Sequence, residues 1–166
     1  MPVDTRILKY DYDVKYFLKQ SNTLYFRLAM PHICIEYSAN LESHVDFPAL
    51  MQALADSAIA TGVFPVGGIR IRAYAATHYR VADGHPDNSF VHVLLKIGHG
   101  RDAPTRQRAC QAIFTTVCEQ CESIYQRLPL GISLEMQVID PVLTFKRNNL
   151  HDYVKSRQAG EGANHG

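Results

Sequence analysis

The chain has 166 residues, a length that fits one domain with enough interior for a hydrophobic core. Its 17 basic residues nearly balance its 16 acidic residues, so net charge gives no reason to expect binding to nucleic acid or to an anionic membrane. No apolar run reaches the roughly 18 residues of a membrane helix, and the charged start "MPVDTRILKYDYD" is not typical of a secretory signal. We expect a cytoplasmic protein with no nucleic-acid or membrane partner.

Residues 1–29 differ in pattern from the rest of the chain. They are rich in Tyr, Lys, Asp and Leu, but they show neither the period of a strand nor that of a helix. Regular patterns begin at Pro31, which follows Met30. Two interpretations of this boundary are open. Pro31 opens a strand within a longer chain, or the Met-Pro pair is the true start of the protein.

The segment after Pro31 has the pattern of a strand, a helix and a second strand. "HICIEY" alternates between apolar and polar residues, as a half-buried strand does. Asp46 followed by Pro48 predicts a helix start, and Gly62 predicts the end of that helix. "GGIRIRAYAA" then alternates again, with the isoleucines on one side and the arginines on the other.

The same order of elements occurs a second time. "FVHVLLKIG" predicts a strand, Asp102 with Pro104 predicts a helix start, and "ISLEMQVID" predicts a final strand. Each crossover is long enough for a right-handed connection between parallel strands. We therefore predict an α/β (α+β) fold of two β-α-β units, with one four-stranded mixed sheet and two helices on one face. Association between copies is the simplest way to cover the other face.

The C-terminal part is expected to be less regular. Residues 143–154 are expected to add an edge strand and a short helix to the domain. The composition of "QAGEGANHG" is typical of disorder, so residues 157–166 are predicted to be a disordered tail.

The four cysteines raise the question of a metal or redox site. Cys118 and Cys121 form a CxxC pair, but the apolar residues from 109 to 128 have helical spacing. Three of the cysteines then lie on or beside the core face of a helix, where a thiol acts as a small hydrophobic group. No second CxxC or His pair has zinc spacing, and no phosphate loop or dinucleotide motif occurs. We expect no metal and no cofactor.

Four stretches closely resemble one known family: "MPHICIEYSANL", "ATGVFPVGGIRIRAY", "ADGHPDNSFVHVLLKIGHGR" and "PVLTFKRNNLH". On these stretches the chain is identified as a member of the 5-carboxymethyl-2-hydroxymuconate Δ-isomerase family of the tautomerase superfamily. The resemblance implies a duplicated β-α-β tautomerase fold in a barrel-like homotrimer. It also implies a cofactor-free isomerase that acts on a small polycarboxylate, yielding the 2-oxo-hex-3-ene-1,6-dioate isomer in homoprotocatechuate (4-hydroxyphenylacetate) degradation.

The resemblance further implies the site residues. An N-terminal proline is the catalytic base of the family, and Pro31 occupies that position, with Arg70 and Arg101 matching two active-site arginines. Proline inside a chain is a tertiary amide with no basic lone pair, so this role requires a chain that begins at Pro31. We therefore expect residues 1–29 to be an extension outside the native enzyme and residues 30–156 to be the isomerase domain.

The roles of three further residues remain open, and two other functions are possible for the chain. Arg72 shares a strand face with Arg70, and His32 follows Pro31, so both are expected to bind substrate; an ion pair or a packed role is the alternative. His99 lies beside Arg101 and could also contact substrate. The alternative functions are a tautomerase for another 2-oxo acid and a non-catalytic tautomerase-fold assembly or binding protein with a blocked Pro31.

Overall fold

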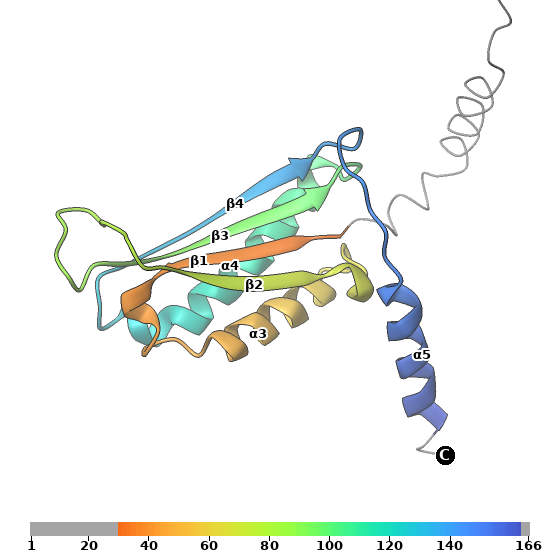
Figure 1. Cartoon of the computed structure of the whole chain (residues 1–166), viewed down its shortest axis with the longest axis horizontal. Coiled ribbons are helices and arrows are strands. Elements are labelled where there is room, and N and C mark those ends of the chain that lie inside the picture. Colours follow the sequence, from red (N-terminus) through yellow and green to blue (C-terminus); the bar gives the residue numbers. More distant parts are fainter. Residues whose placement is uncertain (1–29, 164–166) are drawn as a thin grey trace, which may run out of the picture.

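The computed structural model describes residues 30–163, so the expectation for residues 1–29 lies outside the described part of the chain. Figure 1 shows a sheet with helices α3 and α4 behind one face and α5 at one end. The strands are β1 (His32–Ser38), β2 (Arg70–Ala76), β3 (Ser89–Gly98) and β4 (Leu130–Ile139). The helices are α3 (Phe47–Ala60), α4 (Ala103–Tyr125) and α5 (Leu150–Ala163), with short 3-10 helices η1 (Ala39–Leu41) and η2 (Val66–Gly68).

The strand order in the sheet is β2-β1-β3-β4. β1 pairs in parallel with β2, and β3 pairs in parallel with β4. The two halves meet where β1 and β3 run antiparallel. This arrangement confirms the predicted mixed sheet of two β-α-β units.

Both long helices begin at the predicted caps. The Asp46 carboxylate accepts a hydrogen bond from the backbone N–H of Ala49 at 3.0 Å, and the Asp102 carboxylate accepts one from Thr105 at 2.8 Å. Each contact satisfies one of the N–H groups that the first turn of a helix leaves without a partner. Gly62 follows α3 with a φ of +66°, a left-handed conformation that glycine adopts without steric cost.

The hydrophobic core lies between the two long helices and one face of the sheet. Its fully buried strand residues include Ile33, Ile35 and Leu95, and its helix residues include Leu54 and Ile113. Because side chains alternate along each strand, every second side chain points away from the core, to the other face of the sheet. Among residues 30–163, no helix covers that face. That open face carries the polar and basic residues of the strands.

The cysteines of α4 have the predicted packing. Cys121 is fully buried in the core, while Cys110 and Cys118 are half-buried, and all four cysteines of the chain are free thiols. Burial raises the pKa of Cys121 to about 11, so its thiol stays protonated at neutral pH. The described residues contain no group of three or more His, Cys, Asp or Glu side chains that could hold a metal ion.

The C-terminal region differs from the prediction in two respects. The predicted edge strand is wrong, because Asp140 and Pro141 turn the chain: the Asp140 carboxylate accepts hydrogen bonds from the N–H groups of Val142 and Leu143 at 2.7 and 3.2 Å. In addition, α5 continues to Ala163, so most of the tail predicted to be disordered is helical. The high helix propensity of Lys, Arg, Gln and Ala over residues 155–159 outweighs the low helix propensity of the glycines that follow. Among residues 30–163, no helix is long and apolar enough to cross a membrane.

Candidate active site

Pro31 lies directly before β1, and its side chain is fully buried. Its carbonyl oxygen accepts a hydrogen bond from the backbone N–H of Arg70 at 3.0 Å, which joins the starts of β1 and β2. On the other side of β1, Lys96 pairs with His32, and the next residue of β3 is the buried Ile97. The proline is therefore held in a buried position at one end of the sheet.

The nitrogen of Pro31 forms a peptide bond with Met30 in this chain. A proline amide carries no proton on nitrogen and has no basic lone pair, because resonance with the carbonyl group uses that pair. Pro31 therefore has a defined position at the end of the sheet, but its nitrogen is not basic in this chain. Its nitrogen can act as a base only in a chain whose first residue is Pro31.

Arg70 is held by the backbone of η2. Its Nη1 donates to the carbonyl oxygen of Gly68 at 2.7 Å and to that of Gly67 at 3.3 Å. The side-chain amide of Asn148, far along the sequence, donates to the same Gly67 carbonyl at 3.2 Å. α5 begins against η2 so closely that a Cβ atom on Gly67 would lie 2.7 Å from the His151 ring. The C-terminal segment therefore supports the loop that orients Arg70.

His32 and Arg72 are in contact on the open face. Nη1 of Arg72 lies 3.2 Å from Nδ1 of His32. Burial lowers the pKa of His32, and the positive charges of Arg72, Arg70, Lys146 and Lys96 lower it further. The ring is therefore neutral at pH 7.

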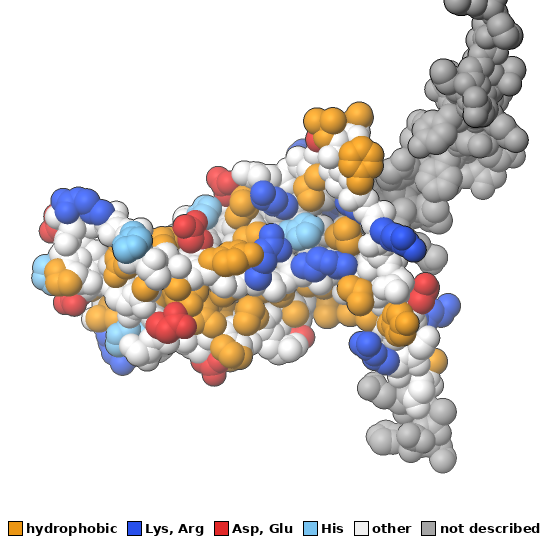
Figure 2. Space-filling view, in the orientation of Figure 1, with side chains coloured by type: hydrophobic (Ala, Val, Ile, Leu, Met, Phe, Trp, Pro, Cys, Tyr) orange, Lys and Arg blue, Asp and Glu red, His pale blue; other side chains and the backbone are white. Residues whose placement is uncertain are grey.

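We call Arg70, Arg72, Lys96, Lys146 and His32 the cationic cluster. Figure 2 shows Lys and Arg side chains gathered around a His on the open face, toward the end of the sheet where α5 begins. None of the four Lys and Arg side chains of this cluster forms an ion pair with an acidic side chain of residues 30–163. A concentration of positive charge without local counter-charges favours binding of a small molecule with several carboxylates.

Arg101 lies just beyond the end of β3 and is only 7% exposed. Its Nη1 donates to the Gly98 carbonyl at 3.1 Å and its Nη2 to the Val63 carbonyl at 3.0 Å, while the guanidinium lies 5.4 Å from the centre of the Phe64 ring. Burial lowers its pKa, yet a guanidinium keeps its charge at neutral pH. These contacts hold the Arg101 side chain in a fixed position.

Lys146 connects Arg101 electrostatically with the cationic cluster. Burial lowers the pKa of Lys146, and the charge of Arg101 lowers it further; Lys146 in turn acts on His32. The end of β3 lies beside the start of β1, so Arg101 is at the same end of the sheet as Pro31. The five predicted site residues therefore share one end of the sheet, where Pro31 and Arg101 are buried and the other three are half-buried.

Sequence reasoning missed Lys96, Lys146 and Asn148. Lys96 alternates with buried residues in "VHVLLKIG", which places it on the same face as His92 and could have drawn attention to it. Lys146 and Asn148 lie in "PVLTFKRNNLH", one of the stretches that carry the family resemblance. His99 is exposed in the loop after β3.

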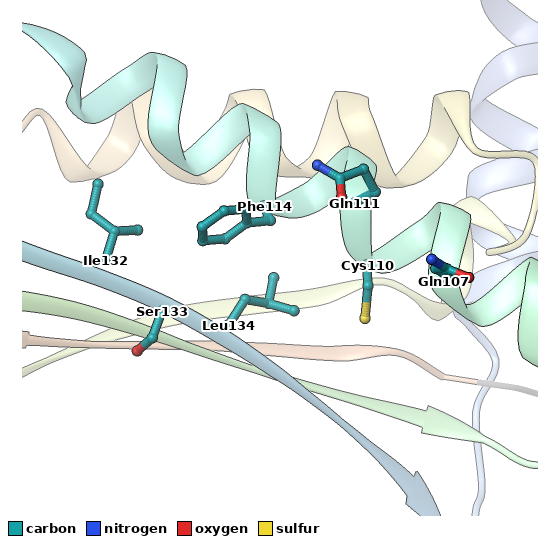
Figure 3. Close-up of a pocket in the computed structure, with 7 residues that line it drawn as sticks. All are labelled: Gln107, Cys110, Gln111, Phe114, Ile132, Ser133 and Leu134. Carbon is teal, nitrogen blue, oxygen red and sulfur yellow. The ribbon is translucent and has the colours of Figure 1, made fainter.

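Two apolar grooves lie at the sheet edges, between the strands and the helices. Figure 3 shows the first, where Phe114 of α4 lies over Ile132 and Leu134 of β4. The second lies between α3 and β2 and includes Ile59 and Ile69. Because β2 and β4 are the two edge strands, the halves of the chain present similar apolar surfaces at opposite edges.

Comparison with known proteins places the chain in a family. The family model described as 5-carboxymethyl-2-hydroxymuconate isomerase matches residues 31–154. The chain belongs to this family. Within it, the 5-carboxymethyl-2-hydroxymuconate Delta-isomerase of Escherichia coli is 36% identical over 126 residues, which make up 76% of this chain and 100% of that relative.

Solved structures agree with this family assignment and with the predicted tautomerase fold. A 5-carboxymethyl-2-hydroxymuconate isomerase from Deinococcus radiodurans R1 superposes with a TM-score of 0.73 and 34% identity, covering 78% of this chain and 97% of that chain. The "Q0 fused 4-OT wild type symmetric trimer" shares the fold alone, with a TM-score of 0.52 and 13% identity over 74% of this chain and 98% of that chain.

Proposed function

We propose that this chain is a cofactor-free isomerase that converts 5-carboxymethyl-2-hydroxymuconate to its 2-oxo-hex-3-ene-1,6-dioate isomer. The family assignment supports the reaction, and the names of the two family relatives supply the substrate. The observation that carries the proposal is the cationic cluster beside a buried, strand-opening proline. We place the reaction in the cytoplasm and in homoprotocatechuate degradation.

The reaction moves a proton from the 2-hydroxyl group to C5 and leaves a conjugated 2-oxo acid. One group must accept and then release the proton, and cations must stabilise the enolate that forms between these steps. The secondary amine of a terminal Pro31 is suited to both transfers. Burial and the nearby cations disfavour the charged ammonium form, so they lower the pKa of this amine below that of an exposed prolyl amine.

The arginines and His32 bind and stabilise the anionic groups in this proposal. Arg70 and Arg72 project from β2 on the face that carries His32, where they can hold substrate carboxylates. Arg101 supplies a fixed positive charge from a buried position at the same end of the sheet. An arginine is suited to these roles because it does not titrate at neutral pH.

The mechanism requires that the active form begin at Pro31. The family match begins at this residue, which supports a start there. In the non-catalytic alternative, Met30 stays attached and Pro31 remains an amide. In the other alternative, the same base acts on a different 2-oxo acid or enol.

We infer that the working assembly is a homotrimer. The two apolar grooves at opposite sheet edges allow a head-to-tail contact between copies, and such contacts can close into a ring. Exposed apolar side chains follow β4, among them Val142 and Phe145, which is 93% exposed. The fold relative with fused chains is a symmetric trimer by its own description.

A comparison of two N-terminal forms tests the proposed function. One protein is produced from Met1, the other from Met30 so that removal of that Met exposes Pro31, and intact mass verifies each start. We expect rapid isomerisation of 5-carboxymethyl-2-hydroxymuconate by the Pro31 form and little by a homogeneous full-length chain. Equal specific activity in an uncleaved full-length preparation would contradict the proposal.

A substrate comparison separates the two catalytic alternatives. We expect the Pro31 form to prefer 5-carboxymethyl-2-hydroxymuconate over 2-hydroxymuconate, which lacks the added carboxymethyl group, by roughly tenfold or more in kcat/KM. This is the scale of one additional charged hydrogen bond. An equal or reversed preference would favour the tautomerase for another substrate.

A further inference from the structure

The contact between Arg72 and His32 defines which ring nitrogen of His32 carries the proton. A guanidinium group has only N–H donors and no acceptor. Because Nη1 of Arg72 lies 3.2 Å from Nδ1 of His32, Nδ1 must be the acceptor in this hydrogen bond. A neutral imidazole with an accepting Nδ1 carries its proton on Nε2.

The surroundings of His32 disfavour a second proton on the ring. The charged groups that act on it are Arg70 and Arg72 of β2, Lys96 of β3 and Lys146 of the segment before α5, and all four are positive. On β1 itself, the nearest acidic side chain on the same face is Glu36, which pairs with Tyr74 and His92 two rows farther along the sheet. A protonated Nδ1 would also lose the hydrogen bond from Arg72.

We propose that His32 is a neutral hydrogen-bond donor to the substrate, with Arg72 fixing its ring so that Nε2–H is presented to a substrate carboxylate. Nε2 makes no hydrogen bond to any residue from 30 to 163, so its proton is available to a ligand on the open face. The identity of the substrate rests on the proposed function, whereas the tautomer of His32 does not. In this arrangement Arg72 is a positioning residue for His32.

The same tautomer excludes His32 as the resting base. A base needs a free lone pair, and the one lone pair of this imidazole, on Nδ1, is engaged by Arg72. His32 therefore donates a hydrogen bond to the substrate but does not take a proton from it. The proton transfer is left to Pro31, the adjacent residue.

Nitrogen NMR of the imidazole rings in the full chain tests the tautomer directly. We expect His32 at pH 7 to be neutral with protonated Nε2 and unprotonated Nδ1, and its pKa to lie below the ordinary value of about 6.5. Arg72→Leu removes both the charge and the hydrogen-bond donor, so it should raise this pKa and abolish the tautomer preference. The matched variant Lys96→Gln removes a charge but not the hydrogen bond, so the tautomer should persist. A protonated Nδ1 at pH 7, or identical effects of the two variants, would overturn the proposal.

Kinetics of His32 variants test the donor role. In the N-terminal form that has isomerase activity, His32→Leu should raise KM on the order of tenfold with a smaller change in kcat, as expected for loss of one hydrogen bond to a charged group. His32→Gln should restore most of the loss, because its amide can accept from Arg72 and donate to substrate. Equal KM values for both variants would overturn the donor role. If neither N-terminal form isomerises the substrate, the proposed function and the substrate of His32 are wrong, while NMR still decides the tautomer.

Discussion

Arg70 and Arg101 lie at the same end of the sheet but in different environments. Arg70 is half-buried at the edge of the open face, with Nη1 held by two carbonyl groups of η2. Arg101 is almost completely buried between the Gly98 and Val63 carbonyls. Sequence alternation could predict the face of Arg70, because that depends only on neighbouring residues. The burial of Arg101 depends on Val63, 38 residues away, which no local pattern encodes.

Replacement of either arginine should impair catalysis strongly. We expect Arg70→Ala and Arg101→Ala each to lower kcat/KM by roughly 10²-fold or more, the scale for losing one charge-stabilising donor. Arg108→Ala is the matched control, since its guanidinium donates to the Thr105 hydroxyl on the exposed side of α4. Steady-state kinetics on variants with native circular dichroism provides the measurement. If Arg70→Ala and Arg108→Ala keep the same kcat/KM, Arg70 has no catalytic role.

At the scale of elements, η2 and α5 form a support for Arg70 that the sequence pattern did not predict. The sequence predicted a short helix in this region, but not its packing on η2, which is a contact between segments about 80 residues apart. The β-α-β units were predictable because alternation and capping act within a few residues. Lys146 was missed because its position near His32 likewise depends on contact between distant parts of the chain.

Gly67→Ala tests this support. The new Cβ atom would lie 2.7 Å from the His151 ring and 2.9 Å from its Cα atom, so α5 or η2 must shift and the anchor of Arg70 with it. We expect a rise in KM together with a loss of thermal stability. Gly131→Ala is the control, because its Cβ would lie 3.9 Å from the nearest neighbour, an ordinary contact. Equal KM values in the two variants would show that α5 does not orient Arg70.

The contacts that Tyr37 makes between β1 and α3 are expected to stabilise the folded protein less at high pH. The Tyr37 hydroxyl donates to the Glu42 carboxylate at 2.6 Å, and its ring stacks on Phe47 at a centroid distance of 3.8 Å. Burial, followed by the hydrogen bond and charge of Glu42, raises the pKa of Tyr37 to about 12. The unfolded value is about 10, so the folded state binds this proton more tightly, and the stabilisation is complete below pH 10 and lost as pH rises toward 12.

Urea unfolding of the parent chain and of Tyr37→Phe measures this effect. We expect the parent's advantage in free energy of unfolding to be largest at pH 8 to 9 and to shrink between pH 10 and 12. A constant difference over this range would mean that the folded protein does not shift the Tyr37 pKa.

At the scale of the whole molecule, the open sheet face and the two edge grooves predict an assembly. Phe114→Glu places a charge in the groove between α4 and β4 without entering the fully buried core. We expect it to convert trimers to smaller species in sedimentation or light scattering. Tyr125→Glu changes an exposed aromatic residue on the same helix outside the groove, and it should leave the trimer intact. A trimer that survives Phe114→Glu would place the interface elsewhere.

The central claim is that the amine of a terminal Pro31 is the base, and the pH dependence of kcat/KM tests it most directly. For the Pro31 form, we predict a rise through one ionisation of the free enzyme near neutrality, below that of an exposed prolyl amine. One alanine inserted ahead of Pro31 displaces the amine by about 3.5 Å. It should lower kcat/KM by more than the roughly 10²-fold that a 1 Å misplacement can cost. If the inserted variant keeps the activity and the pH profile of the Pro31 form, Pro31 is not the base.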